Sequence, residues 1–114
     1  VIVLEGLLGS GKTTLVKGIA SGLGIDESVT SPSYTIMSIY NSGDIPLYHI
    51  DLYRIKSEEE LEDLGITDTY YTDGITIIEW GERALSLLPK ETLKIRINLS
   101  SNDRREIEIE GQTI

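Results

Sequence analysis

The residues whose types and spacing most clearly indicate a functional site lie near the start of the chain. They read Gly6-Leu7-Leu8-Gly9-Ser10-Gly11-Lys12-Thr13-Thr14 and fit the phosphate-loop pattern G-x-x-x-x-G-K-[ST] at every position. In this pattern, backbone N–H groups cradle phosphates and the lysine reaches the β- and γ-phosphates, while the hydroxyl after the lysine faces Mg²⁺. The sequence therefore predicts a site for a nucleoside triphosphate.

The segments on either side of this loop are those that a phosphate-binding loop requires. Val1-Ile2-Val3-Leu4 is an apolar, β-branched run, which predicts a buried strand. Leu15, Ile19 and Leu23 recur at helical spacing, so we expect a helix to follow the loop and to offer its unpaired N–H groups to the anion. The residues expected to bind the nucleotide are Leu8, Gly9, Ser10, Gly11, Lys12, Thr13 and Thr14.

Hydrolysis of a nucleotide also needs a carboxylate for Mg²⁺ and a group that orients water. Two predicted strands, Leu47–Asp51 and Ile75–Glu79, end in acids, and the carboxyl ends of parallel strands line one crevice of a sheet. We expect Glu79 to hold Mg²⁺ together with Thr13, and Asp51 to complete that shell through water or to position the attacking water. For each acid, the alternative is a strand end that faces solvent or caps a helix. The predicted catalytic residues are Lys12, Asp51 and Glu79.

Four further features each allow two interpretations. His49 projects from the same strand face as Asp51, and it fits a catalytic or metal-binding role or a hydrogen-bonded structural one. Trp80 fits packing at a strand end or a substrate platform. Arg54 fits an internal arginine finger or an ion pair with a nearby acid. Ser31-Pro32-Ser33 fits a loop that senses the γ-phosphate or a plain surface turn.

The remaining segments predict a single α/β domain over residues 1–114 with a three-layer, P-loop NTPase-like fold. We expect a mixed sheet flanked by helices, with a hairpin from strands 34–40 and 47–51, and a central parallel strand over 75–80. Ser57 and Glu60 form a capping-box pattern at the start of a short helix that runs to Leu64 and is closed by Gly65. A further helix is expected over 82–88, followed by a hairpin from strands 93–99 and 105–109.

Composition limits the classes of partner. The 114 residues hold ten basic and nineteen acidic side chains, a net charge of −9, which argues against nucleic-acid binding by the chain alone. This acidic charge suits a basic protein partner, or it keeps a small domain soluble. Cysteine is absent, and no apolar run is long enough to cross a bilayer, so we expect a cytoplasmic location without membrane contact. Because the chain begins inside a predicted strand and without methionine, we also expect a preceding segment.

Two other functions use the same phosphate-binding elements. The first is a small-molecule kinase with Asp51 as the base, and the second is a nucleotide-gated binding module in which hydrolysis is incidental. The chain lacks the guanine-reading pattern N-K-x-D, which argues against a GTPase, and it lacks an Arg-rich lid segment, which argues against a nucleotide kinase.

Taken together, the motifs resemble the TsaE family, small P-loop ATPases needed to make threonylcarbamoyladenosine on tRNA. The resemblance covers nearly the whole chain in family order. Beside the phosphate loop, the matching segments are residues 29–35, residues 48–54 with the H-x-D-x-Y-R element at 49–54, residues 59–61 with 64–65, and residues 78–80 with the E-W element at 79–80, followed by 82–83.

The resemblance implies ATP and Mg²⁺ as cofactors, with Thr13 and Glu79 on the metal and Asp51 supporting hydrolysis. It also implies that the loop from Ser31 to Tyr34 acts as a switch. In the family, the ATPase works with the transferase subunit TsaD and the scaffold TsaB, and its hydrolysis supports repeated turnover without performing the transfer. The tRNA would then be contacted only through the complex.

Overall fold

The computed structural model describes residues 1–6, 11–30, 36–81, 87–100 and 104–111. In these ranges no helix is long and apolar enough to span a membrane. The strands are β1 (Ile2–Gly6), β2 (Met37–Tyr40), β3 (Leu47–Asp51), β4 (Ile75–Glu79), β5 (Leu93–Leu99) and β6 (Arg105–Glu110). The helices are α1 (Lys12–Gly22), α2 (Glu58–Asp63) and the 3₁₀ helix η1 (Ile66–Tyr71).

The strands form one mixed sheet in the order β2-β3-β4-β1-β5-β6. The inner strands β3, β4, β1 and β5 run parallel, and the edge strands β2 and β6 pair antiparallel with β3 and β5. Both hairpins and the α/β class expected from the sequence are therefore confirmed. Strand β4 lies between two parallel neighbours, which explains why its sequence is apolar on both faces.

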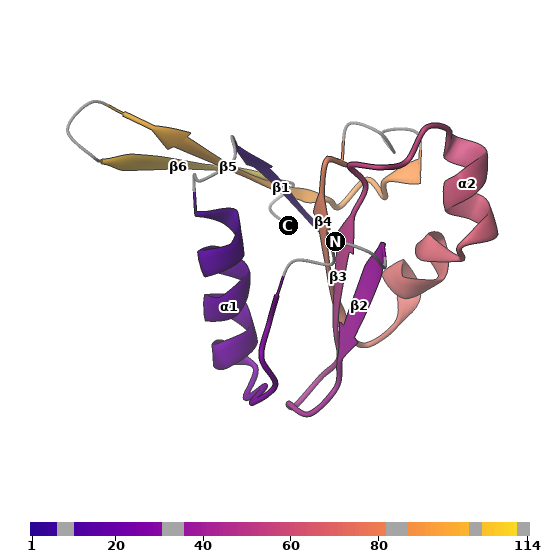
Figure 1. The fold of residues 1–114 in the computed structure, drawn as a ribbon, viewed down its shortest axis with the longest axis horizontal. Helices are drawn as coiled ribbons and strands as arrows, with labels where there is room; N and C mark the ends of the chain where they lie inside the picture. The colour runs from indigo at the N-terminus through magenta and orange to yellow at the C-terminus, as the bar shows by residue number, and fades with distance from the viewer. Residues whose placement is uncertain (7–10, 31–35, 82–86, 101–103, 112–114) are drawn as a thin grey trace.

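Helices cover both faces of the sheet, with α1 on one side and α2 with η1 on the other (Figure 1). Consecutive residues of β4 point to opposite faces and join different cores. Ile77 belongs to the core that contains Val16 of α1, whereas Ile78 belongs to the core that contains Leu61 of α2. This alternation builds the three layers and places one face of β3, β4 and β1 beneath α1.

The predicted boundaries differ from the structure at several elements. Helix α1 begins at Lys12, one turn earlier than expected, and the described part of the second strand begins at Met37. Ser57 is the N-cap of α2, but its side chain makes no capping hydrogen bond, so the capping box is wrong. The first turn of α2 instead carries the carboxylates of Glu58, Glu59 and Glu60. Their negative charges interact favourably with the positive end of the helix dipole. The helix expected over 82–88 lies largely outside the described residues.

Gly81 packs directly against β1, because a Cβ added at this position would lie 2.6 Å from Cγ1 of Val3. We expect Gly81→Ala to lower the free energy of unfolding by roughly 1–3 kcal/mol, since Val3 has a stiff side chain and is buried. Urea denaturation followed by circular dichroism measures the change.

Gly18→Ala is the matched control for this prediction. Gly18 lies within α1, and a Cβ there would meet nothing within 4 Å. Alanine should therefore stabilise the helix by up to about 1 kcal/mol. Equal urea midpoints for Gly81→Ala and the unaltered protein would contradict the close packing of Gly81 on β1.

Candidate functional site

The carboxyl ends of β1, β3 and β4 meet at one edge of the sheet. In the parallel register, Glu79 lies opposite Leu4 on one side and opposite Asp51 on the other. Helix α1 starts at this same edge, and its N-cap Gly11 has a φ of 108°, a conformation that glycine adopts readily and other residues rarely do. The expectation that the two acids end neighbouring strands is confirmed.

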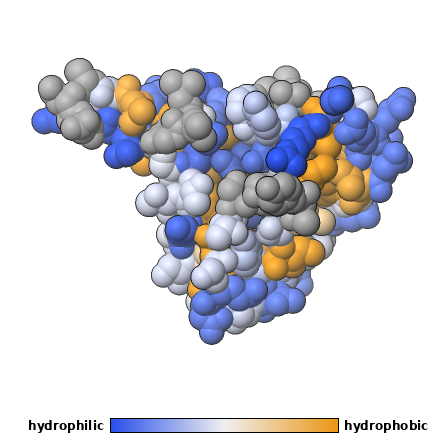
Figure 2. Space-filling view, viewed as in Figure 1, coloured by the Kyte–Doolittle hydropathy of each residue, from blue (hydrophilic) through white to orange (hydrophobic). Residues whose placement is uncertain are grey.

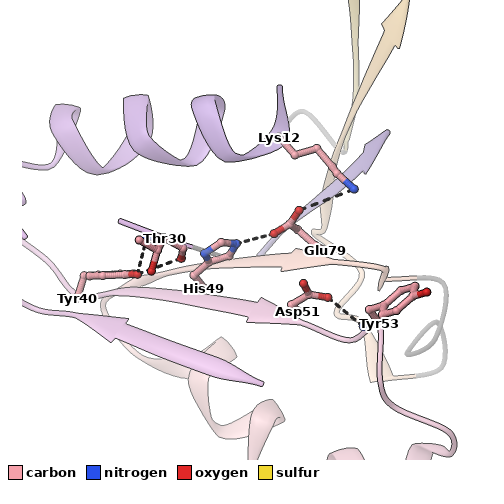
Figure 3. Close-up of polar contacts among 7 residues, drawn as sticks. All are labelled: Lys12, Thr30, Tyr40, His49, Asp51, Tyr53 and Glu79. Atoms are coloured by element: carbon pink, nitrogen blue, oxygen red, sulfur yellow. Dashed lines mark hydrogen bonds and ion pairs between the residues drawn. The ribbon is translucent and has the colours of Figure 1, made fainter. Parts of the chain in front are cut away.

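Three charged or polar side chains form a line at this edge (Figure 3). The Nζ atom of Lys12 lies 3.8 Å from Oε1 of Glu79. The other carboxylate oxygen, Oε2, lies 2.8 Å from Nε2 of His49. Glu79 thus contacts a residue of α1 through one oxygen and a residue of β3 through the other.

The strand register explains why these side chains meet. His49 lies opposite Ile77 in the β3–β4 pair, so Glu79 lies one diagonal step farther along the same face. That face is covered by α1, and burial follows from it: His49 is 0% exposed and Glu79 is 5% exposed. Buried polar groups require partners, and here they provide them for each other. The solvent-facing alternative for Glu79 is therefore wrong.

Trp80 forms part of the same site. Its ring centroid lies 5.5 Å from Nζ of Lys12 and 5.0 Å from the ring centroid of Tyr53. With a φ of 62°, Trp80 adopts a backbone conformation that is uncommon for a bulky residue and that often marks functional positions. A pocket at this edge is lined by Leu4, Glu5, Gly6, Lys12 and Trp80.

Asp51 ends β3 next to Glu79 but makes a different contact. Its Oδ1 accepts a hydrogen bond of 3.0 Å from the backbone N–H of Tyr53, which closes a turn after the strand. Its own backbone N–H donates to the carbonyl of Ile36 at 2.9 Å. The structure places Asp51 at the expected edge, and its role in hydrolysis stays a prediction.

Glu5 at the end of β1 was not identified from the sequence. It lines the pocket, and one of its oxygens accepts a hydrogen bond of 3.1 Å from Nε of Arg96 on β5. This hydrogen bond and the attraction to Glu5 raise the pKa of the Arg96 guanidinium. The available signal was an acid directly before Gly6 in an otherwise apolar strand.

The remaining predicted contacts are described only in part. Thr13 and Thr14 lie in the first turn of α1, where Thr13 is half-buried and Thr14 is exposed. Leu8, Gly9, Ser10 and the loop from Ser31 to Tyr34 lie outside the described residues.

Thr13 and Glu79 provide the kinds of donor that suit a magnesium ion. A hydroxyl and a carboxylate are hard oxygen ligands, and Mg²⁺ commonly takes one or two carboxylates together with phosphate and water oxygens. Oε1 of Glu79 faces the ammonium group of Lys12, so this oxygen already has a positively charged group as its neighbour. The residues present therefore fit Mg²⁺ bound with a nucleotide.

The fold and site define a class of small α/β proteins in which a strand and the helix that follows it in the sequence lie beside a strand that ends in a buried carboxylate, and a lysine of the helix contacts that carboxylate. The chain belongs to the TsaE family, because the family model described as "Threonylcarbamoyl adenosine biosynthesis protein TsaE" matches residues 1–107. This match confirms the resemblance inferred from the motifs.

Relatives from three bacteria carry the name tRNA threonylcarbamoyladenosine biosynthesis protein TsaE. The chain is 45% identical to the Treponema pallidum protein over 96% of this chain and 80% of that protein. It is 48% identical to the Bacillus subtilis protein over 94% of this chain and 66% of that protein. For the Haemophilus influenzae protein, the identity is 43% over 98% of this chain and 70% of that protein.

The crystal structure of Bacillus subtilis YdiB has the same fold. It matches with a TM-score of 0.78 and 40% sequence identity, covering 93% of this chain and 64% of that chain. The chain thus spans about two thirds of the length of the Bacillus subtilis sequence and of the YdiB chain in the crystal structure.

Proposed function

We propose that this chain is the ATP-binding and ATP-hydrolysing component of the machinery that makes N6-threonylcarbamoyladenosine on tRNA. In this role its hydrolysis supports repeated turnover of a transferase subunit. The observation that carries the proposal is the contact between Lys12, which closes the phosphate-loop sequence, and the buried Glu79 at the end of the adjacent strand. Membership of the TsaE family supplies the pathway.

Each residue of the site would perform a distinct task. Lys12 would exchange its contact with Glu79 for the β- and γ-phosphates, and the free N–H groups of the first turn of α1 would bind the same anion. Thr13 and Glu79 would hold Mg²⁺, which when bound neutralises charge on the phosphate oxygens. Asp51 would orient the attacking water from the neighbouring strand end.

The surface supports a protein partner more than direct contact with tRNA. The outward side of α2 is hydrophilic (Figure 2), and its exposed side chains include five acids, Glu58, Glu59, Glu60, Glu62 and Asp63. Such a surface repels a phosphate backbone and attracts basic protein surfaces. We therefore propose that the chain works in the cytoplasm with TsaD-like transferase and TsaB-like scaffold subunits, which would hold the tRNA.

A reconstituted threonylcarbamoylation assay tests this proposal. Transferase and scaffold subunits are supplied with tRNA and an activated threonylcarbamoyl donor prepared beforehand, and this chain replaces the ATPase component. We expect multiple rounds of modification with ATP and at most one round with a non-hydrolysable ATP analogue. Equal turnover with both nucleotides would favour the nucleotide-gated module, whereas transfer of phosphate to a small acceptor would favour a kinase.

A further inference from the structure

His49 is a buried histidine whose ring makes a polar contact at Nε2. This nitrogen lies 2.8 Å from Oε2 of Glu79, and the His49 side chain has no exposed surface. A carboxylate that binds a cation accepts hydrogen bonds and does not donate them, so in the proposed function Nε2 of the imidazole would be the donor in this contact. Nδ1 is also buried and has no hydrogen-bond partner among the described residues. Within this part of the chain, the contact with Glu79 is therefore the ring's hydrogen bond.

The backbone holds this pair in place. His49 lies on β3 and Glu79 on β4, two inner strands joined in parallel register from Leu47 opposite Ile75 to Asp51 opposite Glu79. The offset between the two side chains is set by the sheet, because neither residue belongs to a loop. An imidazole fixed in this way can restrain the torsion of a neighbouring carboxylate, which is otherwise broad.

The two oxygens of Glu79 are used differently. Oε2 accepts the hydrogen bond from His49, while Oε1 is directed to the Lys12 ammonium group (Figure 3). If phosphates attract Lys12, Oε1 is released, and the contact with His49 is unaffected. The carboxylate then keeps its direction at the moment when its free oxygen is needed.

We propose that His49 is a positioning residue that holds Oε2 of Glu79, so that Oε1 faces the nucleotide and its cation. This inference rests on the proposed function, in which Glu79 binds Mg²⁺. A hydrogen-bond partner of a metal-ligating carboxylate orients it, and the loss of such a partner typically weakens metal affinity or activity by 10- to 100-fold.

Three substitutions at position 49 separate orientation from polarity and packing. His49→Gln can place an amide N–H near the position of Nε2, whereas the shorter His49→Asn places its amide nearer to Nδ1, and His49→Leu provides no donor. The binding of a fluorescent ATP analogue is measured in EDTA and over a series of Mg²⁺ concentrations. We expect His49→Asn and His49→Leu to raise, by about 10-fold or more, the Mg²⁺ concentration at which half of the Mg²⁺-dependent change in analogue binding is reached. For His49→Gln this concentration should stay close to that of the unaltered protein. Affinity in EDTA should be the same for all.

Thr76→Val provides a matched control for the loss of a buried polar group. Thr76 also lies on β4 and is 2% exposed, but its hydroxyl bonds to Thr69 on the side of η1. This variant should lower the thermal midpoint without changing the Mg²⁺ dependence. If His49→Leu fails to fold, the comparison of His49→Gln with His49→Asn still tests the positioning role.

The outcomes distinguish this inference from the proposed function. If Glu79→Ala changes the Mg²⁺ dependence while Asn and Leu at position 49 do not, the positioning role is wrong and the function stands. Equal Mg²⁺ dependence for Gln and Asn would also overturn the positioning role, since polarity alone would then suffice. If Glu79→Ala leaves the Mg²⁺ dependence unchanged, the metal assignment and the positioning role are both wrong.

Discussion

Lys12→Ala is expected to weaken ATP binding by at least ~100-fold. The ammonium group would make contacts with two phosphates, and each charge-assisted hydrogen bond contributes about 1.5 kcal/mol or more, where 1.4 kcal/mol is a factor of ten. In the structure, Lys12 is held at the edge of the sheet by Glu79 and the Trp80 ring, close to where the phosphates would bind. Isothermal titration calorimetry with ATP and Mg²⁺ measures the loss.

Lys17→Ala controls for the change in net charge. Lys17 lies on the same helix and is exposed, so both variants lose one positive charge from α1. We expect Lys17→Ala to bind ATP like the unaltered protein at physiological salt, because Lys17 lies more than one helical turn beyond Lys12 and salt screens its exposed charge. A similar loss for both variants would mean that Lys12 acts through net charge and not through a phosphate contact.

The parts of the site that could be predicted from the sequence are those in which a functional residue belongs to a recognisable local pattern. Lys12 and Glu79 were identified because a phosphate-loop pattern and a strand ending in an acid are local features. That Asp51 and Glu79 lie at the same end of the sheet followed from the rule that the carboxyl ends of parallel strands line one crevice, and the structure shows that their strands are neighbours. These predictions need little knowledge of contacts between residues far apart in the sequence. The fold class was predicted from the same local features.

The contacts within the site could not be predicted in the same way. His49 and Asp51 share a face because they lie two positions apart on one strand, but the register that makes His49 and Glu79 diagonal neighbours depends on how β3 and β4 align. Glu5 and Arg96 are separated by 91 positions and meet only through the pairing of β1 with β5. The left-handed conformation of Trp80 has no local signal, since a bulky residue disfavours it.

The buried carboxylate of Glu79 leads to the second large expected effect. Glu79→Gln keeps the volume of the side chain and an oxygen that can accept the Nε2–H hydrogen bond of His49, but it removes the negative charge. We expect Mg²⁺-dependent ATP hydrolysis to fall on the order of 100-fold, because the bound metal ion contributes several kcal/mol of transition-state stabilisation and a neutral amide would hold that ion less well than a carboxylate. ATP binding in EDTA should remain close to that of the unaltered protein. Phosphate release in the reconstituted complex and calorimetry measure the two quantities.

Glu110→Gln controls for the removal of a strand-end acid. Glu110 also ends a strand, but this strand is β6, an edge strand of the sheet. Strand β5 separates β6 from β1, and the side chain of Glu110 is exposed. Its amide variant should hydrolyse ATP like the unaltered protein. Retention of normal hydrolysis by Glu79→Gln would contradict a role for the carboxylate charge, whereas equal losses of binding in EDTA and of hydrolysis would indicate a structural role. The separation of binding from hydrolysis is what distinguishes a metal-holding carboxylate from one that only pairs with Lys12.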